Sequence, residues 1–121
     1  MASKRVLVVD DSPTERHATS TLLQKQGYDV SIAVDGEDAL EKVAAGRPPL
    51  IVLDIILPKL NGYQVLRQLK AAPETRDIKV ILVSSKNQAS DRFWGLKQGA
   101  DDYIAKPYAD EALLAAVARH L

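Results

Sequence analysis

The stretch Leu50-Ile-Val-Leu-Asp54 decides the fold, because four consecutive apolar residues run directly into an aspartate. A strand with one face in water alternates apolar and polar residues. An unbroken apolar run is instead typical of a strand buried on both faces of a parallel sheet. The runs at residues 6–9 and 80–83 have the same character. Together the three runs predict the interior of a parallel sheet with helices packed on both sides.

Helix signals alternate with the strand signals along the chain. Ser12 and Pro13 are typical of a helix start, and Glu15 is placed to complete a capping box. Gly27 and Gly46 are placed to end helices. We expect five strands, at residues 5–10, 29–33, 50–54, 80–84 and 102–105. Five successive strand–helix units predict a doubly wound α/β fold with right-handed crossovers.

The composition fits one folded domain over residues 1–121, with no linker and no attached output domain. Hydrophobic residues make up 46% of the chain, which is enough for a buried core. Sixteen basic side chains balance sixteen acidic ones. A nucleic-acid binder would need a basic surplus to contact phosphates, so we expect no nucleic-acid partner.

The residues that the chain lacks exclude further classes of protein. There is no cysteine, which excludes disulfide scaffolds, thiolate metal sites and cysteine nucleophiles. His17 and His120 are the two histidines, too few for a multi-histidine metal centre, and we expect both to be solvated. The N-terminus has no secretory apolar segment, and no run approaches the roughly 18 residues of a membrane span. We therefore expect a cytoplasmic protein without membrane insertion.

Polar residues stand where the predicted strands end. Asp10 and Asp11 close the first strand, Asp54 ends the third, Ser84 ends the fourth, and Lys106 follows the fifth. Ligands of open α/β sheets bind at the carboxyl ends of the strands, so we expect these side chains to share one cleft. Each residue also has an ordinary interpretation as a turn aspartate, a strand-end hydroxyl or a solvated lysine. Their joint occurrence favours a functional site.

The chemistry of such a cleft follows from its charges. Three carboxylates repel one another unless a cation lies between them, and Mg²⁺ (or Mn²⁺) with oxygen ligands meets that need. With Lys106 included the formal charges sum to zero, which suits a phosphoryl group arriving on one carboxylate. Asp54 is the best candidate for the nucleophile. Asp10 and Asp11 would hold the metal, while Lys106 and Ser84 would contact phosphoryl oxygens.

At these residues the sequence resembles the CheY-like receiver domains of two-component response regulators, over essentially its whole length. The matching segments are Val8-Val-Asp-Asp-Ser12, Asp54-Ile-Ile-Leu-Pro58 with Asn61-Gly62, Ser84, and Lys106-Pro107. The resemblance implies a flavodoxin-like (βα)5 fold with a doubly wound parallel five-stranded sheet in the order 2-1-3-4-5.

By this resemblance Asp54 is the phosphoacceptor, and Lys106 contacts the phosphoryl group and precedes a cis proline bond. The implied metal ligands are the side chains of Asp10, Asp11 and Asp54 with the backbone carbonyl of Ile56. Ser84 and Tyr103 are the implied switch residues. Two positions, Ile56 and Lys86, depart from the best-known chemotaxis pattern. In this family they influence how readily water attacks the aspartyl phosphate, so the resemblance implies slower self-dephosphorylation than in receivers with polar or acidic residues there.

The resemblance also implies a function and partners. The chain would be a phosphorylation-activated switch of a two-component phosphorelay, and not an enzyme with a separate substrate. A sensor histidine kinase or histidine phosphotransfer protein would supply the phosphoryl group. An unknown output protein would bind the face made by the fourth helix, fifth strand and fifth helix. We expect a monomer or a weak phosphorylation-dependent dimer.

The segments Ser12-Pro-Thr-Glu15 and Asp91-Arg-Phe-Trp-Gly95 are similar to those of stand-alone regulators of type IV pilus systems. That similarity implies a role in motility or taxis control, and twitching motility, phototaxis and chemotaxis all remain open. Phe93 and Trp94 are adjacent in the predicted fourth helix, so both cannot lie on one core-facing stripe. Either one is partly exposed as an interface anchor, or the helix is wedged between the sheet and a loop.

The sequence disfavours three other functions. An aspartyl-phosphate phosphatase would carry a second aspartate two positions after the nucleophile, where this chain has Ile56. A flavin or nucleotide carrier would need a glycine-rich phosphate loop, and the acidic cleft would repel a cofactor phosphate. A receiver-like scaffold that is never phosphorylated is disfavoured by the complete set of site residues.

Overall fold

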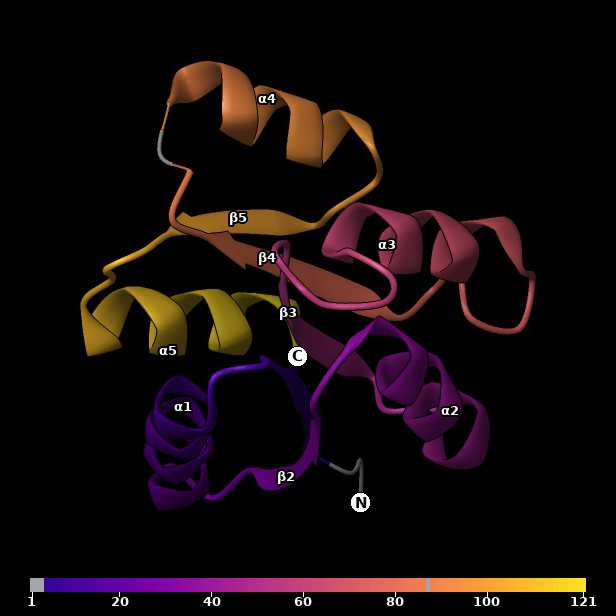
Figure 1. The fold of residues 1–121 in the computed structure, drawn as a ribbon. Coiled ribbons are helices and arrows are strands. Elements are labelled where there is room, and N and C mark those ends of the chain that lie inside the picture. The colour runs from indigo at the N-terminus through magenta and orange to yellow at the C-terminus, as the bar shows by residue number, and fades with distance from the viewer. Residues whose placement is uncertain (1–3, 87) are drawn as a thin grey trace.

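The computed structural model describes residues 4–86 and 88–121, in which strands and helices alternate (Figure 1). The strands are β1 (Arg5–Val9), β2 (Asp29–Ala33), β3 (Leu50–Asp54), β4 (Lys79–Ser84) and β5 (Asp102–Ala105). The helices are α1 (Pro13–Lys25), α2 (Gly36–Gly46), α3 (Gly62–Ala71), α4 (Ala89–Lys97) and α5 (Asp110–His120). These strands form one parallel sheet in the order β2-β1-β3-β4-β5. The predicted fold class and strand order are confirmed, and the predicted strand limits differ by one residue in β1 and in β4.

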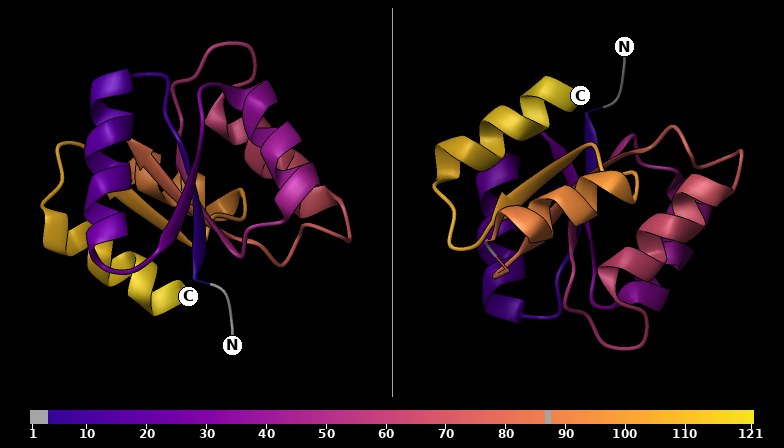
Figure 2. Two further views of the ribbon diagram at one scale, coloured as in Figure 1. Left: turned by 90° about the horizontal axis from the view of Figure 1, so that it is seen from below. Right: turned by 90° about the horizontal axis from the view of Figure 1, so that it is seen from above.

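Helices cover both faces of the sheet, with α1 and α5 on one side and α2, α3 and α4 on the other (Figure 2). Successive side chains of a strand point to opposite faces, so one run of apolar residues supplies two cores. Leu7 and Val9 of β1 lie in the cluster beneath α2 and α3. Val6 and Val8 lie in the cluster beneath α1 and α5. This explains why the central strands are continuously apolar.

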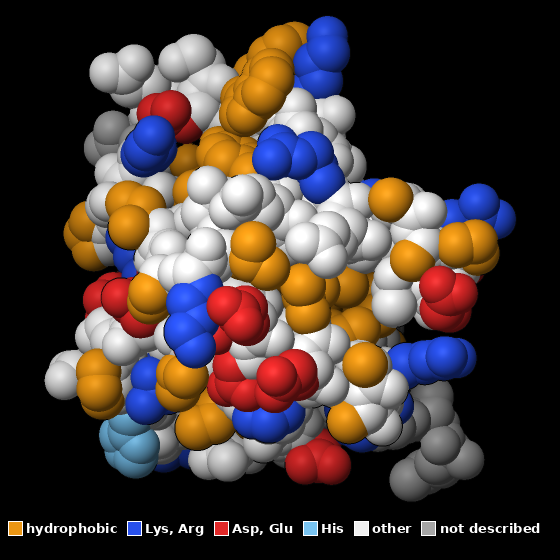
Figure 3. Space-filling model, turned by 45° about the vertical axis from the view of Figure 1, so that its right-hand side comes forward, with side chains coloured by type: hydrophobic (Ala, Val, Ile, Leu, Met, Phe, Trp, Pro, Cys, Tyr) orange, Lys and Arg blue, Asp and Glu red, His pale blue; other side chains and the backbone are white. Residues whose placement is uncertain are grey.

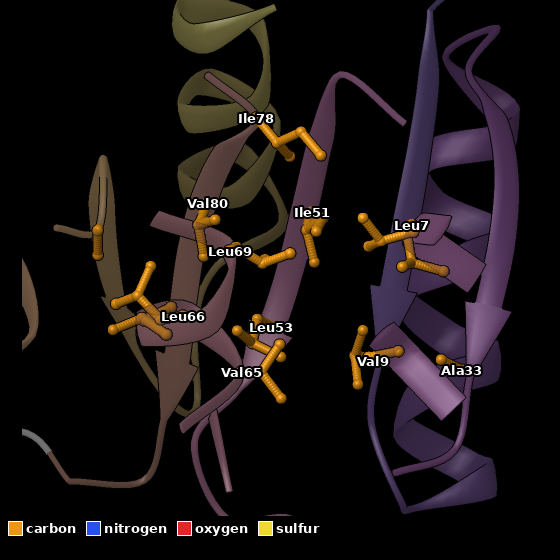
Figure 4. Close-up of a cluster of buried hydrophobic side chains, with 14 of the residues drawn as sticks. Leu7, Val9, Ala33, Ile51, Leu53, Val65, Leu66, Leu69, Ile78 and Val80 are labelled. Carbon is orange, nitrogen blue, oxygen red and sulfur yellow. The ribbon is translucent and has the colours of Figure 1, made fainter. Parts of the chain in front are cut away.

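The cluster beneath α2 and α3 gives the strand ends a rigid base. Figure 4 shows Leu69 of α3 beside Ile51 of β3, and Val65 of α3 beside Leu53. All four are at most 2% exposed. Burying one such side chain contributes about 1.5–3 kcal/mol relative to leaving it in water. The apolar side chains of β1 and β3 are therefore well packed just before the carboxyl ends of these strands, which holds those ends in place.

The start of α1 differs from the sequence prediction in one respect. Ser12 caps the helix as predicted, since its Oγ accepts a hydrogen bond from the Glu15 N–H at 3.3 Å. The Glu15 side chain does not complete the capping box, so that prediction is wrong. The Ser12 N–H, which Glu15 was expected to bind, donates to Asp10 Oδ1 at 2.9 Å. The Glu15 carboxylate is thereby released for another contact.

The helix ends follow the predicted glycine signals in part. Gly27 has a φ of +90°, in the left-handed region that glycine adopts most readily. Helix α2 ends at Gly46 as predicted, but the residue in the left-handed conformation is the following Arg47, with a φ of 43°. The Arg5 guanidinium donates to the carbonyl oxygens of Gly46 at 2.6 Å and Arg47 at 3.2 Å. These two bonds hold the turn in place without a glycine at its left-handed position.

Helix α4 leaves its large apolar side chains in solvent. Phe93 is 64% exposed and Trp94 is 50% exposed, so both side chains, and not only one of them, face outward. Hydrophobic side chains accordingly protrude where α4 lies, at the top of Figure 3. The residue of α4 that is buried is Gly95, and a Cβ there would lie 2.8 Å from the Tyr103 ring. Close packing of the α4 backbone on Tyr103 thus replaces the usual apolar stripe.

Asp102 joins α4 and α5, which pack on opposite faces of the sheet, to the start of β5. Its carboxylate is buried and accepts a hydrogen bond from Arg119 of α5 at 2.7 Å. The Nε2 of His120 lies 3.2 Å from the same oxygen, and Arg92 of α4 lies 3.7 Å from the other. The sequence suggested that His120 is solvated. The last turn of α5 instead places its ring beside the buried Asp102 carboxylate. Burial alone would raise the pKa of Asp102, but its hydrogen bonds with Arg119, the Tyr103 N–H and His120 lower it.

We expect Asp102→Asn to lower the free energy of unfolding by about 1.5–3 kcal/mol at neutral pH, because a buried charged acceptor is lost. A carboxyl whose pKa is lowered by folding contributes stability above its ordinary pKa. That contribution disappears as the pH falls through the lowered value. The difference between wild type and variant should therefore be largest at neutral pH and shrink below about pH 4. Urea unfolding of both proteins across this range measures it, and a difference that does not vary with pH would contradict the argument.

Candidate functional site

The strand topology brings four of the predicted site residues together. Asp10 and Asp11 follow β1, Asp54 ends the neighbouring β3, and Lys106 follows β5. Asp10, Asp11 and Asp54 each offer a carboxylate oxygen, and these three oxygens lie within 4.8 Å of one another. Asp11, Asp54 and Lys106 line a cleft of about 220 Å³ that opens to solvent. The predicted convergence of the strand ends is therefore observed.

Lys106 lies between the carboxylates. Its Nζ is 3.0 Å from Asp54 Oδ2 and 3.3 Å from Asp10 Oδ2. It is also 2.9 Å from Glu15 Oε1, a contact that the sequence analysis missed because Glu15 was interpreted as a helix cap. Burial alone would lower the pKa of Lys106, but the contacts with these carboxylates raise it above its ordinary value. Lys106 is therefore charged throughout the physiological range.

Backbone hydrogen bonds orient the two buried aspartates. Asp10 Oδ1 accepts from the Ser12 N–H, which leaves Oδ2 directed at Lys106. Asp54 Oδ1 accepts from the Ile56 N–H at 3.3 Å, and its Oδ2 faces Lys106. Burial raises the pKa of Asp54 above its ordinary value, the bond with Lys106 opposes that rise, and the nearby Asp10 charge adds to it. The positive charge of Lys106 therefore offsets only part of the cost of burying the Asp54 carboxylate.

The two implied switch residues, Ser84 and Tyr103, meet at one backbone residue. Ser84 is fully buried, and its Oγ accepts from the Lys86 N–H at 3.1 Å. Tyr103 is 3% exposed, and its hydroxyl donates to the Lys86 carbonyl at 2.8 Å. Both switch candidates therefore bind the backbone of Lys86. The sequence does not indicate these two hydrogen bonds, because every residue has the same backbone N–H and carbonyl groups that Lys86 uses here.

The Lys106–Pro107 peptide bond is cis, as the resemblance implied. The Lys106 N–H donates to the Ser84 carbonyl at 2.7 Å, which ties the lysine to the end of β4. Ile56, the residue whose carbonyl was expected to bind metal, lines the same cleft and is 56% exposed.

The donor set fits a hard divalent cation. Carboxylate oxygens and a backbone carbonyl are the ligands that Mg²⁺ prefers, and Mg²⁺ keeps several of its waters. Three carboxylate oxygens gather at a solvent-open cleft, so room for bound water remains. Asp11 is exposed and can reach a hydrated ion at the cleft mouth. The cluster is therefore suited to Mg²⁺ or Mn²⁺.

Comparison with known proteins gives consistent matches. The profile of the response regulator receiver domain matches residues 6–118. The chain is 44% identical to protein PilH of Pseudomonas aeruginosa over 110 residues, covering 91% of each chain. It is 42% identical to protein PilG of the same organism over 117 residues, covering 97% of this chain and 87% of PilG.

Solved structures agree with these sequence matches. The chemotaxis response regulator CheY4 of Vibrio cholerae superposes with a TM-score of 0.92 at 28% identity, covering 99% of this chain and 100% of that one. The receiver domain of a Pseudomonas aeruginosa sensor histidine kinase superposes with a TM-score of 0.89 at 29% identity, covering 98% of both chains. That structure has a magnesium ion coordinated in its active-site cleft.

Within residues 4–86 and 88–121, this chain has no helix with the length and apolar character of a membrane span.

Proposed function

The chain belongs to the response regulator receiver domain family, and from that premise we propose that Asp54 accepts a phosphoryl group in a two-component phosphorelay. The observation that carries the proposal is the placement of the Asp54 carboxylate. It is buried, it bonds to Lys106 at 3.0 Å, and it shares an open cleft with the oxygen cluster of Asp10 and Asp11. Phosphoryl transfer needs positioning and charge neutralisation more than covalent assistance, and this cleft supplies both.

The donor is a phosphohistidine of a sensor histidine kinase or a histidine phosphotransfer protein. An Asp54 carboxylate oxygen forms a bond to phosphorus while the bond between phosphorus and the imidazole nitrogen breaks. The nitrogen keeps the electron pair and takes a proton from water, and Asp54 carries an acyl phosphate. Lys106 donates to a phosphoryl oxygen as a fixed positive charge. A second hollow of about 410 Å³, lined by α1 residues and Tyr108, shares Lys106 with the cleft.

The ligands that would hold Mg²⁺ (or Mn²⁺) are Asp10, Asp11, Asp54 and the Ile56 carbonyl. When bound, the ion supplies positive charge that offsets the phosphoryl oxygens. The residues of this chain orient the reaction: Ser12 fixes the Asp10 carboxylate, and the Ile56 N–H fixes Asp54 Oδ1. The Asp54 oxygen that faces Lys106 is thereby held at the cleft.

The output is a change of shape on the face formed by α4, β5 and α5. Ser84 and Tyr103 both bind the Lys86 backbone, so movement of the Ser84 hydroxyl toward a phosphoryl oxygen disturbs the Tyr103 hydrogen bond. Tyr103 packs directly beneath Gly95 of α4, which couples that disturbance to the exposed Phe93 and Trp94. Phosphorylation then shifts the population between two forms of this face, and an output protein binds one of them.

The unit proposed is a single receiver domain over residues 1–121 that signals by protein contact in motility or taxis control. The similarity to PilH and PilG supports the predicted kinship with the stand-alone regulators of type IV pilus systems. The balanced charge of the chain, with sixteen basic and sixteen acidic side chains, supports a protein partner over a nucleic acid. We propose a monomer, or a dimer that forms weakly after phosphorylation.

Incubation with acetyl phosphate is expected to add one phosphoryl group to the protein in the presence of Mg²⁺ and none when the ion is chelated. Intact-mass spectrometry measures the adduct, and peptide mapping after borohydride reduction of the acyl phosphate places it at Asp54. Acetate leaves with the bonding pair, so no further reactant is needed. An adduct on another residue, or equal labelling with and without the ion, would refute the proposed function.

A further inference from the structure

Glu15 occupies an unexpected place for the third residue of a helix. Such a glutamate ordinarily turns back to the N-cap N–H. Here Asp10 already accepts the Ser12 N–H, and the Glu15 carboxylate extends to Lys106 instead, at 2.9 Å. In α3, the equivalent Gln64 does turn back and accepts the Asn61 N–H at 2.9 Å. The direction of Glu15 is therefore a specific feature of α1.

This contact adds a third carboxylate beside the ammonium group of Lys106. An ammonium group has three N–H donors. Lys106 Nζ lies 2.9 Å from Glu15, 3.0 Å from Asp54 and 3.3 Å from Asp10. Lys106 thus donates to Asp54 and Asp10 and forms an ion pair with Glu15, so a phosphoryl oxygen that binds Lys106 competes with three carboxylate oxygens.

The three carboxylates differ in how easily they can leave. The side chains of Asp10 and Asp54 are 8% and 10% exposed, and the backbone around each strand end holds them in place. The side chain of Glu15 is 53% exposed, and it reaches the cleft from the first turn of α1 through a flexible side chain. Releasing Glu15 into water requires only a rotamer change. It is the carboxylate that can be displaced without moving a strand.

We propose that Glu15 is a competing residue that holds Lys106 in the unphosphorylated protein and slows the loading of Asp54. The inference rests on the proposed function of Asp54 and deepens it. Two anionic oxygens that share one ammonium at about 2.9 Å lie within about 6 Å of each other, where like charges repel. A phosphoryl group therefore enters the cleft against the Glu15 charge, and it binds Lys106 fully once Glu15 has left.

Glu15→Gln is expected to load Asp54 about three- to tenfold faster than wild type, with acetyl phosphate as donor and saturating Mg²⁺. Glutamine has nearly the same shape but cannot compete as an anion. Intact-mass spectrometry at timed intervals gives the rate at several donor concentrations. A mutation that merely loosened α1 would not raise this rate, so the direction of the change separates competition from a structural effect.

Glu37→Gln provides the matched control, because Glu37 is an exposed acid in the first turn of α2 that contacts no described site residue. It removes the same charge and should load at the wild-type rate. A second readout is the crystal structure of wild-type protein with Mg²⁺ and beryllofluoride, in which Glu15 should lie beyond 4 Å from Lys106, outside ion-pair distance.

Two outcomes would overturn the inference: an unchanged or slower loading rate in Glu15→Gln, or an intact contact between Glu15 and Lys106 in the beryllofluoride complex. Failure of the proposed function has a different signature, because then wild type and Glu15→Gln alike would show no Mg²⁺-dependent adduct.

Discussion

Asp54→Asn is expected to take up no phosphoryl group under conditions in which wild type is fully labelled. The amide that replaces the carboxylate is a poor nucleophile, and the variant keeps the shape of the side chain and the packing of β3. The loss should therefore be complete and not partial, since the remaining cleft residues position a nucleophile that is no longer there. Intact-mass spectrometry with acetyl phosphate and Mg²⁺ measures it.

The same variant should be more stable than wild type when Mg²⁺ is absent. Burial and the Asp10 charge raise the pKa of Asp54, so the folded protein holds its ionised form at a disadvantage. A carboxyl whose pKa is raised by folding makes the free energy of unfolding fall as the pH rises through that range. The full loss is present at neutral pH. Removing the charge should raise the free energy of unfolding by about 0.5–2 kcal/mol, as substitutions at functional sites often do.

Asp77→Asn is the control for both parts of this prediction. Asp77 is an exposed aspartate in the turn between α3 and β4, so its variant should be labelled like wild type and should unfold at the same temperature. Phosphoryl uptake by Asp54→Asn at the wild-type rate would place the acceptor elsewhere. A lower unfolding temperature for Asp54→Asn would show that the bond with Lys106 outweighs the burial of the charge.

The fold was predictable because its strongest signals are local. Unbroken apolar runs such as Leu50–Asp54 locate buried strands, and the aspartates that end them locate the carboxyl edge of the sheet. The positions of Asp10, Asp11, Asp54 and Lys106 follow from that topology alone. Side-chain length and rotamer play little part in bringing strand ends together.

The features that sequence reasoning missed depend on competition between partners. Glu15 has an ordinary local role as a helix cap, and it loses that role because Asp10, two residues before Ser12 in the chain, accepts the same N–H. His120 was expected in solvent, yet its ring lies 3.2 Å from the carboxylate of Asp102, the first residue of β5. A sequence pattern describes each residue's own preference, and these outcomes depend on which of several acceptors lies closest in the folded chain.

The exposure of α4 was underestimated for a related reason. Helical periodicity assumes that a helix packs through its larger apolar side chains. In α4 the packing residue is Gly95, whose missing side chain lets the backbone approach Tyr103. Phe93 and Trp94 are left in solvent as a consequence. The absence of a side chain is a weak signal in a hydrophobic pattern.

Gly62→Ala is expected to lower the free energy of unfolding by about 2–4 kcal/mol and to disturb the acceptor loop. A Cβ at residue 62 would lie 2.5 Å from the Asp54 carbonyl oxygen and 2.7 Å from the Ile55 Cα. Both are backbone atoms, so no side-chain rotation can relieve the overlap. The Gly62 N–H also donates to the Ile55 carbonyl at 2.8 Å, so α3 cannot retreat without losing that bond. Urea unfolding measures the loss, and phosphoryl uptake with acetyl phosphate should fall at temperatures where the variant is still folded.

Gly46→Ala separates this steric effect from the general behaviour of glycine. Residue 46 lies in the last turn of α2, and a Cβ there would meet only the Arg5 Nη1 atom, at an ordinary 3.5 Å. Alanine is the better helix former, so this variant should be as stable as wild type or more stable, with unchanged phosphoryl uptake. If Gly62→Ala behaved in the same way, the close approach of α3 to the Asp54 backbone would have no role in holding the acceptor. The combination expected here, in which one added methyl is harmless and the other is severe, arises because α3 begins directly against the peptide that follows Asp54.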